Sequence, residues 1–81
     1  MGIKLAVVKR IESLCKERGI AVNALANLAG LTPSTVYSML DPKRKDIGVV
    51  VIKKLCDGLD MTIAEFFDSG EFKDLEQEIY E

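Results

Sequence analysis

Residues 22–40 limit the possible folds of this 81-residue chain more than any other segment. Ala26 is small enough, at an inward-facing position, for a second helix to cross closely. Gly30 follows four residues later and can turn the chain sharply, because a positive φ costs little only for glycine. Thr32 and Pro33 then start a new helix, since threonine is a good N-cap and proline suits the first helical position. The segment therefore predicts two short helices that cross at a tight turn.

The rest of the chain carries apolar residues at helical spacing, which predicts three further helices. Gly19 ends the first of the five, and Thr62 with Glu65 forms a capping box at the start of the last. The second helix starts poorly, because Ala21 offers no side-chain acceptor to the free backbone N–H groups. The five expected helices span about residues 3–18, 22–29, 33–40, 48–57 and 63–67.

The fourth helix is expected against its local propensity. The β-branched residues 49–52 would indicate a strand if they stood alone. However, Ile52, Leu55, Cys56 and Leu59 continue as an apolar stripe at helical spacing. A single short strand would also have no pairing partner, so we expect a helix.

Length and composition fit one small folded domain. The apolar content of 48% is typical of a globular protein. No apolar run approaches the roughly 18 residues of a membrane span, and the first residues lack the apolar core of a signal peptide. These features predict a cytoplasmic protein with no membrane partner.

The net charge of −2 hides a strong division along the chain. Residues 1–55 hold ten Lys and Arg against four acids, a net charge of +6, whereas residues 56–81 hold one Lys against nine acids, a net charge of −8. Local potential, rather than net charge, governs attraction to phosphates. A basic body with an acidic tail is therefore compatible with nucleic-acid binding.

Catalysis and metal binding have little support in this sequence. The chain has no His, no CxxC pair and no Gly-rich phosphate loop. Cys15 and Cys56 lie on apolar helical faces, which indicates buried thiols rather than a disulfide in a reducing compartment. We expect no enzyme activity, no cofactor and no metal site.

The helix pair and its flanks resemble the helix-turn-helix of the Cro and lambda-repressor group, often called XRE-like regulators. VNALANLAGLTPSTVYSML matches the central motif, RIESLCKERGI precedes it, and DIGVVVIKKLCDGLDMTIAEFFD is similar to the fourth and fifth helices. The resemblance implies an all-α, compact five-helix lambda-repressor-like DNA-binding bundle over residues 1–68. A short acidic C-terminal extension, residues 69–81, follows it.

The resemblance also implies which residues face the bases of duplex DNA. In this family, residues in the first turn of the third helix and at a position one turn later contact the bases. The residue next to that later position lies beside them. The matching residues here are Pro33, Ser34, Tyr37 and Ser38. Pro33 stands where relatives often carry Gln and offers only apolar contact, and serine discriminates weakly between bases. Part of the specificity is therefore expected from DNA shape.

A second set of residues is expected to contact phosphates. Helix N-termini attract anions, and a cationic loop directly follows the predicted recognition helix. Relatives often place Gln at the position of Val22 to bond a phosphate, and Asn23 is the nearest substitute. The candidates are Asn23, Thr32, Thr35, Lys43, Arg44 and Lys45.

Several of these assignments have a purely structural alternative. Thr32 can serve only as a cap, Thr35 can bond its own helix backbone, Tyr37 can pack against the loop, and the cationic loop can be a solvated turn. We expect Lys9, Arg10, Lys53 and Lys54 to lie on solvated helix faces.

The acidic tail has a weak amphipathic pattern. Phe72, Leu75 and Ile79, with Tyr80 beside them, suit a short helix. Such a tail can fold back on the bundle or fray, make a dimer contact, or compete with DNA for the basic face.

Together these features predict a sequence-specific regulator of transcription that binds double-stranded DNA, a repressor acting by occluding a promoter. One helix-turn-helix reads too few base pairs for selective binding in a genome, so we expect a homodimer on a two-fold-related operator. The alternative is a protein-interaction module, an antitoxin or adaptor, that uses the same bundle with DNA binding secondary or absent. A ligand-sensing regulator is a weaker third hypothesis.

Overall fold

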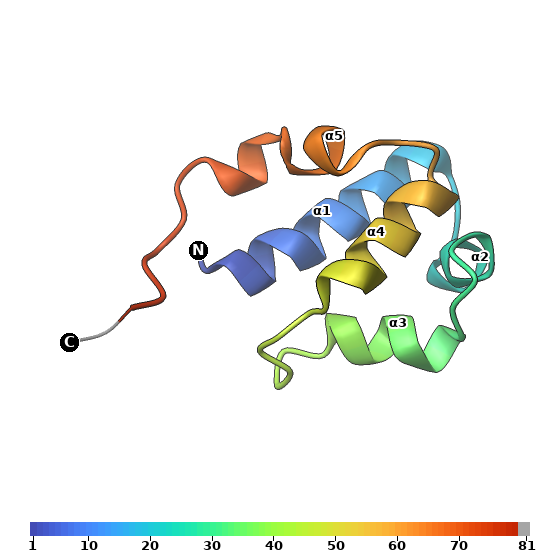
Figure 1. Ribbon diagram of the computed structural model, residues 1–81, viewed down its shortest axis with the longest axis horizontal. Coiled ribbons are helices and arrows are strands. Elements are labelled where there is room, and N and C mark those ends of the chain that lie inside the picture. Colours follow the sequence, from blue (N-terminus) through green and yellow to red (C-terminus); the bar gives the residue numbers. More distant parts are fainter. Residues whose placement is uncertain (80–81) are drawn as a thin grey trace.

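The computed structural model describes residues 1–79, and these form five α-helices and one short 3₁₀ turn (Figure 1). The helices and the turn are α1 (Ile3–Arg18), α2 (Val22–Leu28), α3 (Pro33–Leu40), α4 (Val49–Gly58), α5 (Ile63–Phe67) and η1 (Gly70–Phe72). α2 packs against both α3 and α4, α4 packs against α5, and η1 packs against α1. The predicted all-α bundle is confirmed.

The helix bounds follow the sequence pattern closely. α1, α3 and α5 begin and end where predicted, α2 ends one residue earlier, and α4 is shifted by one residue. The β-branched run in α4 is helical because Ile52, Leu55 and Cys56 then face the core together. Tertiary packing therefore overrides the local strand propensity.

One apolar core joins the first four helices to α5. Its largest fully buried side chains are Phe66, Ile11, Leu25, Leu55, Leu59, Val36 and Cys56. Cys15 and Cys56 are both buried free thiols, as predicted, and burial raises the pKa of each. The two thiols thus act as small apolar side chains in the core.

Three helices end in the same hydrogen-bonding pattern with a left-handed residue. Gly19 follows α1 and Gly30 follows α2, with φ values of 64° and 68°. The Leu31 N–H then donates to the carbonyl of Ala26 at 2.9 Å, which closes the turn before α3. α4 ends in the same way, but Asp60, with φ of 54°, takes the place of glycine. The turn at residues 59–61 therefore has the left-handed conformation without a glycine.

The Gly30→Val substitution is expected to lower the free energy of unfolding by about 1–3 kcal/mol. A Cβ at residue 30 would meet no heavy atom within 4 Å, so the cost arises from the backbone conformation rather than from a clash. Chemical denaturation would measure the loss. Gly30→Asn is the matched control, since asparagine tolerates positive φ. Equal stability of the valine variant and the parent would contradict the assignment.

The acidic tail does not form the short helix that its apolar spacing suggests. Only η1 is helical, and residues 73–79 have no regular structure. The Glu76 N–H donates to the carbonyl of Met1 at 3.1 Å, and the Glu76 carboxylate lies 3.7 Å from the amino terminus. Pairing with the N-terminal residues and repulsion among the tail's carboxylates both oppose a helix. Tyr80 lies outside the described residues.

Candidate nucleic-acid interface

α3 lies along one edge of the bundle and exposes one face (Figure 1). Its inner face buries Val36 and Met39, which attach the helix to the core. Pro33, Ser34 and Tyr37 are exposed, and 55% of the Tyr37 surface is accessible. A helix held in this way can present its first two turns to a ligand.

Three hydroxyl groups meet at the start of α3. The Thr32 Oγ1 accepts the Thr35 backbone N–H at 3.3 Å, so the predicted cap is confirmed. The same oxygen lies 3.1 Å from Ser34 Oγ and 2.9 Å from Thr35 Oγ1. These contacts fix the hydroxyl groups before any ligand binds.

The loop that follows α3 is held in place by its own contacts and by a lysine from α1. Asp41 accepts the Lys43 backbone N–H at 2.9 Å through its side chain and the Arg44 N–H at 3.0 Å through its carbonyl. The Lys4 Nζ donates to the Asp41 carbonyl at 2.8 Å and also to the Arg44 carbonyl. Lys4 thereby fixes the loop relative to the bundle. No local sequence pattern marks Lys4 for this role.

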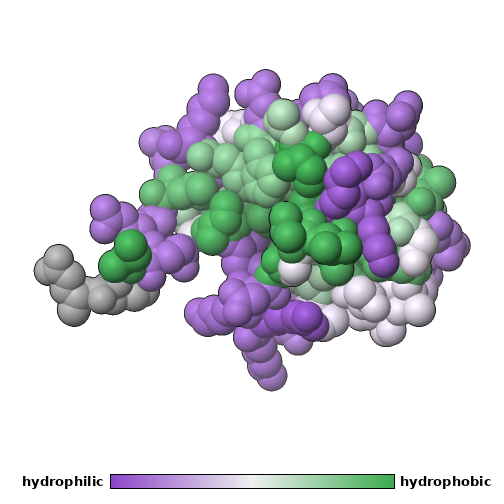
Figure 2. Space-filling model, in the orientation of Figure 1, coloured by the Kyte–Doolittle hydropathy of each residue, from purple (hydrophilic) through white to green (hydrophobic). Residues whose placement is uncertain are grey.

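Arg44 connects this loop back to α3. Its NH1 donates to the Ser38 Oγ at 2.8 Å, and its Nε donates to the Asp46 carbonyl at 3.3 Å. The structure therefore brings together two candidates that the sequence analysis assigned to different roles, Ser38 to bases and Arg44 to phosphates. Lys43 and Lys45 are exposed beside them, and neither side chain has a hydrogen-bond partner within residues 1–79. In the view of Figure 2, hydrophilic side chains project from the edge where this loop lies in Figure 1.

Asn23 lies outside this cluster, on the first turn of α2. Its side chain is exposed, and no hydrogen bond within the described chain involves it. Ala21, the N-cap residue of α2, provides no side-chain cap, as predicted. α2 packs against α3, so Asn23 lies on the helix next to α3 rather than on α3 itself.

Arg10 does not lie on a solvated helix face, so that expectation was wrong. Its Nε donates to the Phe66 carbonyl at 2.8 Å, and its NH2 donates to the Glu65 carbonyl at 3.0 Å. The guanidinium carbon also lies 5.9 Å from the centre of the Phe66 ring. Arg10 thus donates to two carbonyls in the last turn of α5, where a helix leaves carbonyls without partners of its own. The charged guanidinium therefore helps to attach α5 to α1.

The described part of the acidic tail leaves α3 uncovered. Residues 73–79 run out beyond the N-terminus of α1, on the opposite side from α2 (Figure 1). The contacts of Glu76 with Met1 place this segment at the first residues of the chain.

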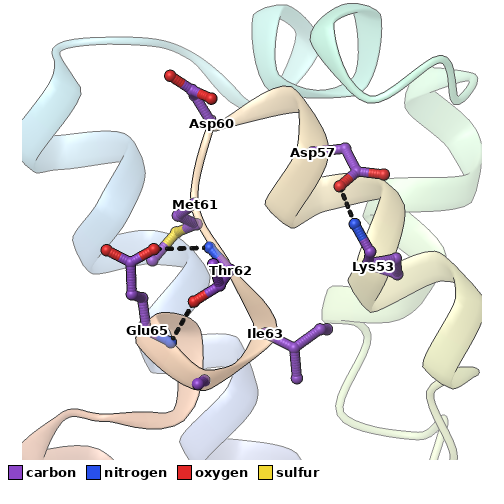
Figure 3. A pocket seen from close by; sticks show the side chains of 8 residues that line it. Lys53, Asp57, Asp60, Met61, Thr62, Ile63 and Glu65 are labelled. Carbon is purple, nitrogen blue, oxygen red and sulfur yellow. Dashed lines mark hydrogen bonds and ion pairs between the residues drawn. The ribbon is translucent and has the colours of Figure 1, made fainter.

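A shallow pocket lies between α4 and α5, and no residue of α3 lines it (Figure 3). Thr62 and Glu65 exchange hydrogen bonds of 2.8 and 3.0 Å there, which confirms the predicted capping box. The bond from the Thr62 backbone N–H lowers the pKa of Glu65. Lys53 pairs with Asp57 on the same wall. Most of the pocket's polar side chains are therefore already paired with groups of α4 and α5.

Two properties of residues 1–79 concern other classes of function. Within them no helix is long and apolar enough to cross a membrane. In the same residues, no three His, Cys, Asp or Glu side chains gather as a metal site would require.

The comparisons with known proteins agree with this geometry. The family model of the Cro/C1-type HTH DNA-binding domain matches residues 10–69. Among solved structures, the chain is similar to the prophage Lp1 protein 11, with 28% sequence identity and a TM-score of 0.80. That match covers 93% of this chain and 100% of the prophage protein. Comparison with curated proteins gives no match.

Proposed function

Because this chain belongs to the Cro/C1-type helix-turn-helix family, and is thus a DNA-binding regulator of transcription, we propose that it is a sequence-specific repressor. In this proposal α3 enters the major groove of double-stranded DNA, and the bound protein occludes a promoter. The setting is the cytoplasm, and no enzymatic step is involved.

One observation carries the proposal: α3 exposes its first two turns beside a fixed cationic loop. An α-helix of about 10–12 Å diameter fits the major groove, which is about 12 Å wide. The Lys43–Lys45 loop would then face the phosphates that border the groove. In this placement the loop contacts phosphates and positions the protein, while α3 contacts the bases.

The base-reading residues follow from the exposed face of α3. The exposed Ser34 and Tyr37 and the half-buried Ser38 supply hydroxyl groups. Pro33 supplies an apolar contact that suits a thymine methyl group. We propose these four as the base-contacting set.

The phosphate-contacting set surrounds them. Thr32 and Thr35 lie at the N-terminus of α3, where backbone N–H groups favour an anion. Asn23 would approach the backbone from the first turn of α2, and Lys43, Arg44 and Lys45 from the loop. The capping and loop-fixing contacts described above are compatible with this role, because they orient these groups without neutralising the loop's charge.

We further propose a homodimer on a two-fold-related operator, with half-sites about 34–36 Å apart. Val49 and Val50, in the first turn of α4, are 71% and 64% exposed, and such apolar groups suit a protein contact. The same two valines also favour the second candidate function, a protein-interaction module such as an antitoxin or adaptor. Binding to duplex DNA decides between the two functions.

Selection of binding sites from random duplexes, followed by salt titration of the selected site, tests the proposal. We expect an enriched, two-fold-symmetric sequence and affinity that falls steeply as salt rises. Absence of any salt-dependent duplex binding would favour the protein-interaction module.

Lys45→Ala is expected to lower the salt slope by about 0.9, because one phosphate contact is lost. Its base preferences should remain those of the parent, since phosphate contacts carry no sequence information directly. Lys73→Ala is the matched control, because it removes the same charge from the tail. Identical slopes for Lys45→Ala and Lys73→Ala would remove Lys45 from the phosphate set.

A further inference from the structure

The contact between Arg44 and Ser38 is not required by a phosphate role for Arg44. The two residues lie six positions apart, and the guanidinium NH1 is 2.8 Å from the Ser38 Oγ. The Nε bond to the Asp46 carbonyl, at 3.3 Å, holds the same guanidinium from the other side. The arginine is thus anchored in the loop while it contacts the helix.

This contact fixes the polarity of the Ser38 hydroxyl group. A guanidinium can only donate hydrogen bonds, so the Ser38 oxygen must accept. Within residues 1–79 the Ser38 hydroxyl donates no hydrogen bond of its own. The hydroxyls of Thr32 and Ser34 differ, because either of them can be the donor to the other.

We propose that Arg44 is a positioning residue that makes Ser38 a hydrogen-bond donor toward the DNA. The inference rests on the proposed function and adds to it a base preference at one position of the binding site. In the major groove, guanine, adenine and thymine each present an acceptor, whereas the edge of cytosine presents only the N4 amino donor. The Ser38 oxygen keeps one further lone pair, but accepting from the cytosine amino group would bring a second donor close to the guanidinium cation. Cytosine should therefore be the least favoured base facing Ser38.

The positive charge on Arg44 strengthens this donor. A hydroxyl that accepts a bond from a cation donates its own hydrogen more strongly, since linked hydrogen bonds polarise one another. The NH2 group of Arg44 has no hydrogen-bond partner in the described part of the chain. Arg44 can therefore contact a phosphate through NH2 while it orients Ser38 through NH1.

The test uses the full chain and the duplex selected from a random library. Site selection with the parent and with Ser38→Ala identifies the base position that Ser38 reads. Cytosine is then placed at that position, and affinities for both duplexes are measured for the parent, Ser38→Ala, Arg44→Ala and the double variant. Lys45→Ala serves as the control that removes an equal charge from the same loop without touching Ser38.

For the parent and for Lys45→Ala, we expect cytosine to weaken binding about 3- to 10-fold, as for one lost hydrogen bond. Arg44→Ala should reduce that penalty to the level of Ser38→Ala, and the double variant should show no further change. A merely structural role for Arg44 would shift all affinities without changing the cytosine penalty.

Three outcomes would overturn the inference. They are a full cytosine penalty in Arg44→Ala, cytosine as the favoured base at that position, and identical selected sequences for Ser38→Ala and the parent. A parent that binds no duplex in a salt-dependent way gives a different result, because the proposed function itself then fails and the inference falls with it.

Discussion

Phe66→Ala is expected to lower the free energy of unfolding by about 3–5 kcal/mol, the range for removing a large buried aromatic side chain. Phe66 is fully buried, and its ring centre lies 5.0 Å from that of Phe67 and 6.1 Å from that of Phe72. α5 has only five residues, so its own hydrogen bonds cannot hold it in place. The Phe66 ring and the Arg10 contacts attach α5 to the bundle, and the alanine variant would loosen that attachment.

Urea denaturation followed by circular dichroism would measure this loss. A domain of this size has a total stability of about 4–12 kcal/mol, so the substitution would remove from about a quarter to all of it. Phe67→Ala is the control, because Phe67 is only half-buried and should cost less. Equal midpoints for the two variants would contradict the central position of Phe66.

Gly58→Ala is expected to destabilise the protein by about 1–3 kcal/mol, although alanine is the better helix former. A Cβ at residue 58 would lie 2.8 Å from the carbonyl carbon and oxygen of Leu28 and 2.9 Å from the Ala29 nitrogen. These atoms are backbone at the C-terminal end of α2, so they cannot move aside as a flexible side chain could. The last turn of α4 can cross α2 this closely only with glycine.

Gly70→Ala provides the matched comparison for this prediction. A Cβ at residue 70 would meet no heavy atom within 4 Å, and the φ value there is not positive. Thermal unfolding of both variants should show a lower melting temperature for Gly58→Ala only. A stabilised Gly58→Ala variant, as expected for an open helix position, would show that α2 and α4 do not cross so closely.

The sequence predicted those features of the fold that depend on neighbours along the chain. Gly30, Thr32 and the capping box at Thr62 act within a few residues, so their types and spacing were enough. Gly58 and Lys4 were missed because they act across the bundle, where no local pattern marks them. The Lys4 bond to the Asp41 carbonyl joins residues 37 positions apart.

In the candidate interface too, local features could be predicted from the sequence and long-range contacts could not. The exposed residues of α3 could be chosen from the family resemblance and helical periodicity alone. The pairing of Arg44 with Ser38 could not, because it depends on how the loop folds back after Asp41. Arg10 shows the opposite error, since a basic residue on a helix was read as solvated although it binds the end of α5.

The shortness of α2 and α3 decides how this protein can be engineered. They contain seven and eight residues, below the roughly 12–15 that an isolated helix needs in water, and α2 begins without a side-chain cap. A synthetic peptide copied from residues 22–40 would therefore be a disordered coil with little affinity for any duplex. Transplanting a sequence preference to another scaffold means moving the outward side chains onto a host that already supplies a rigid body.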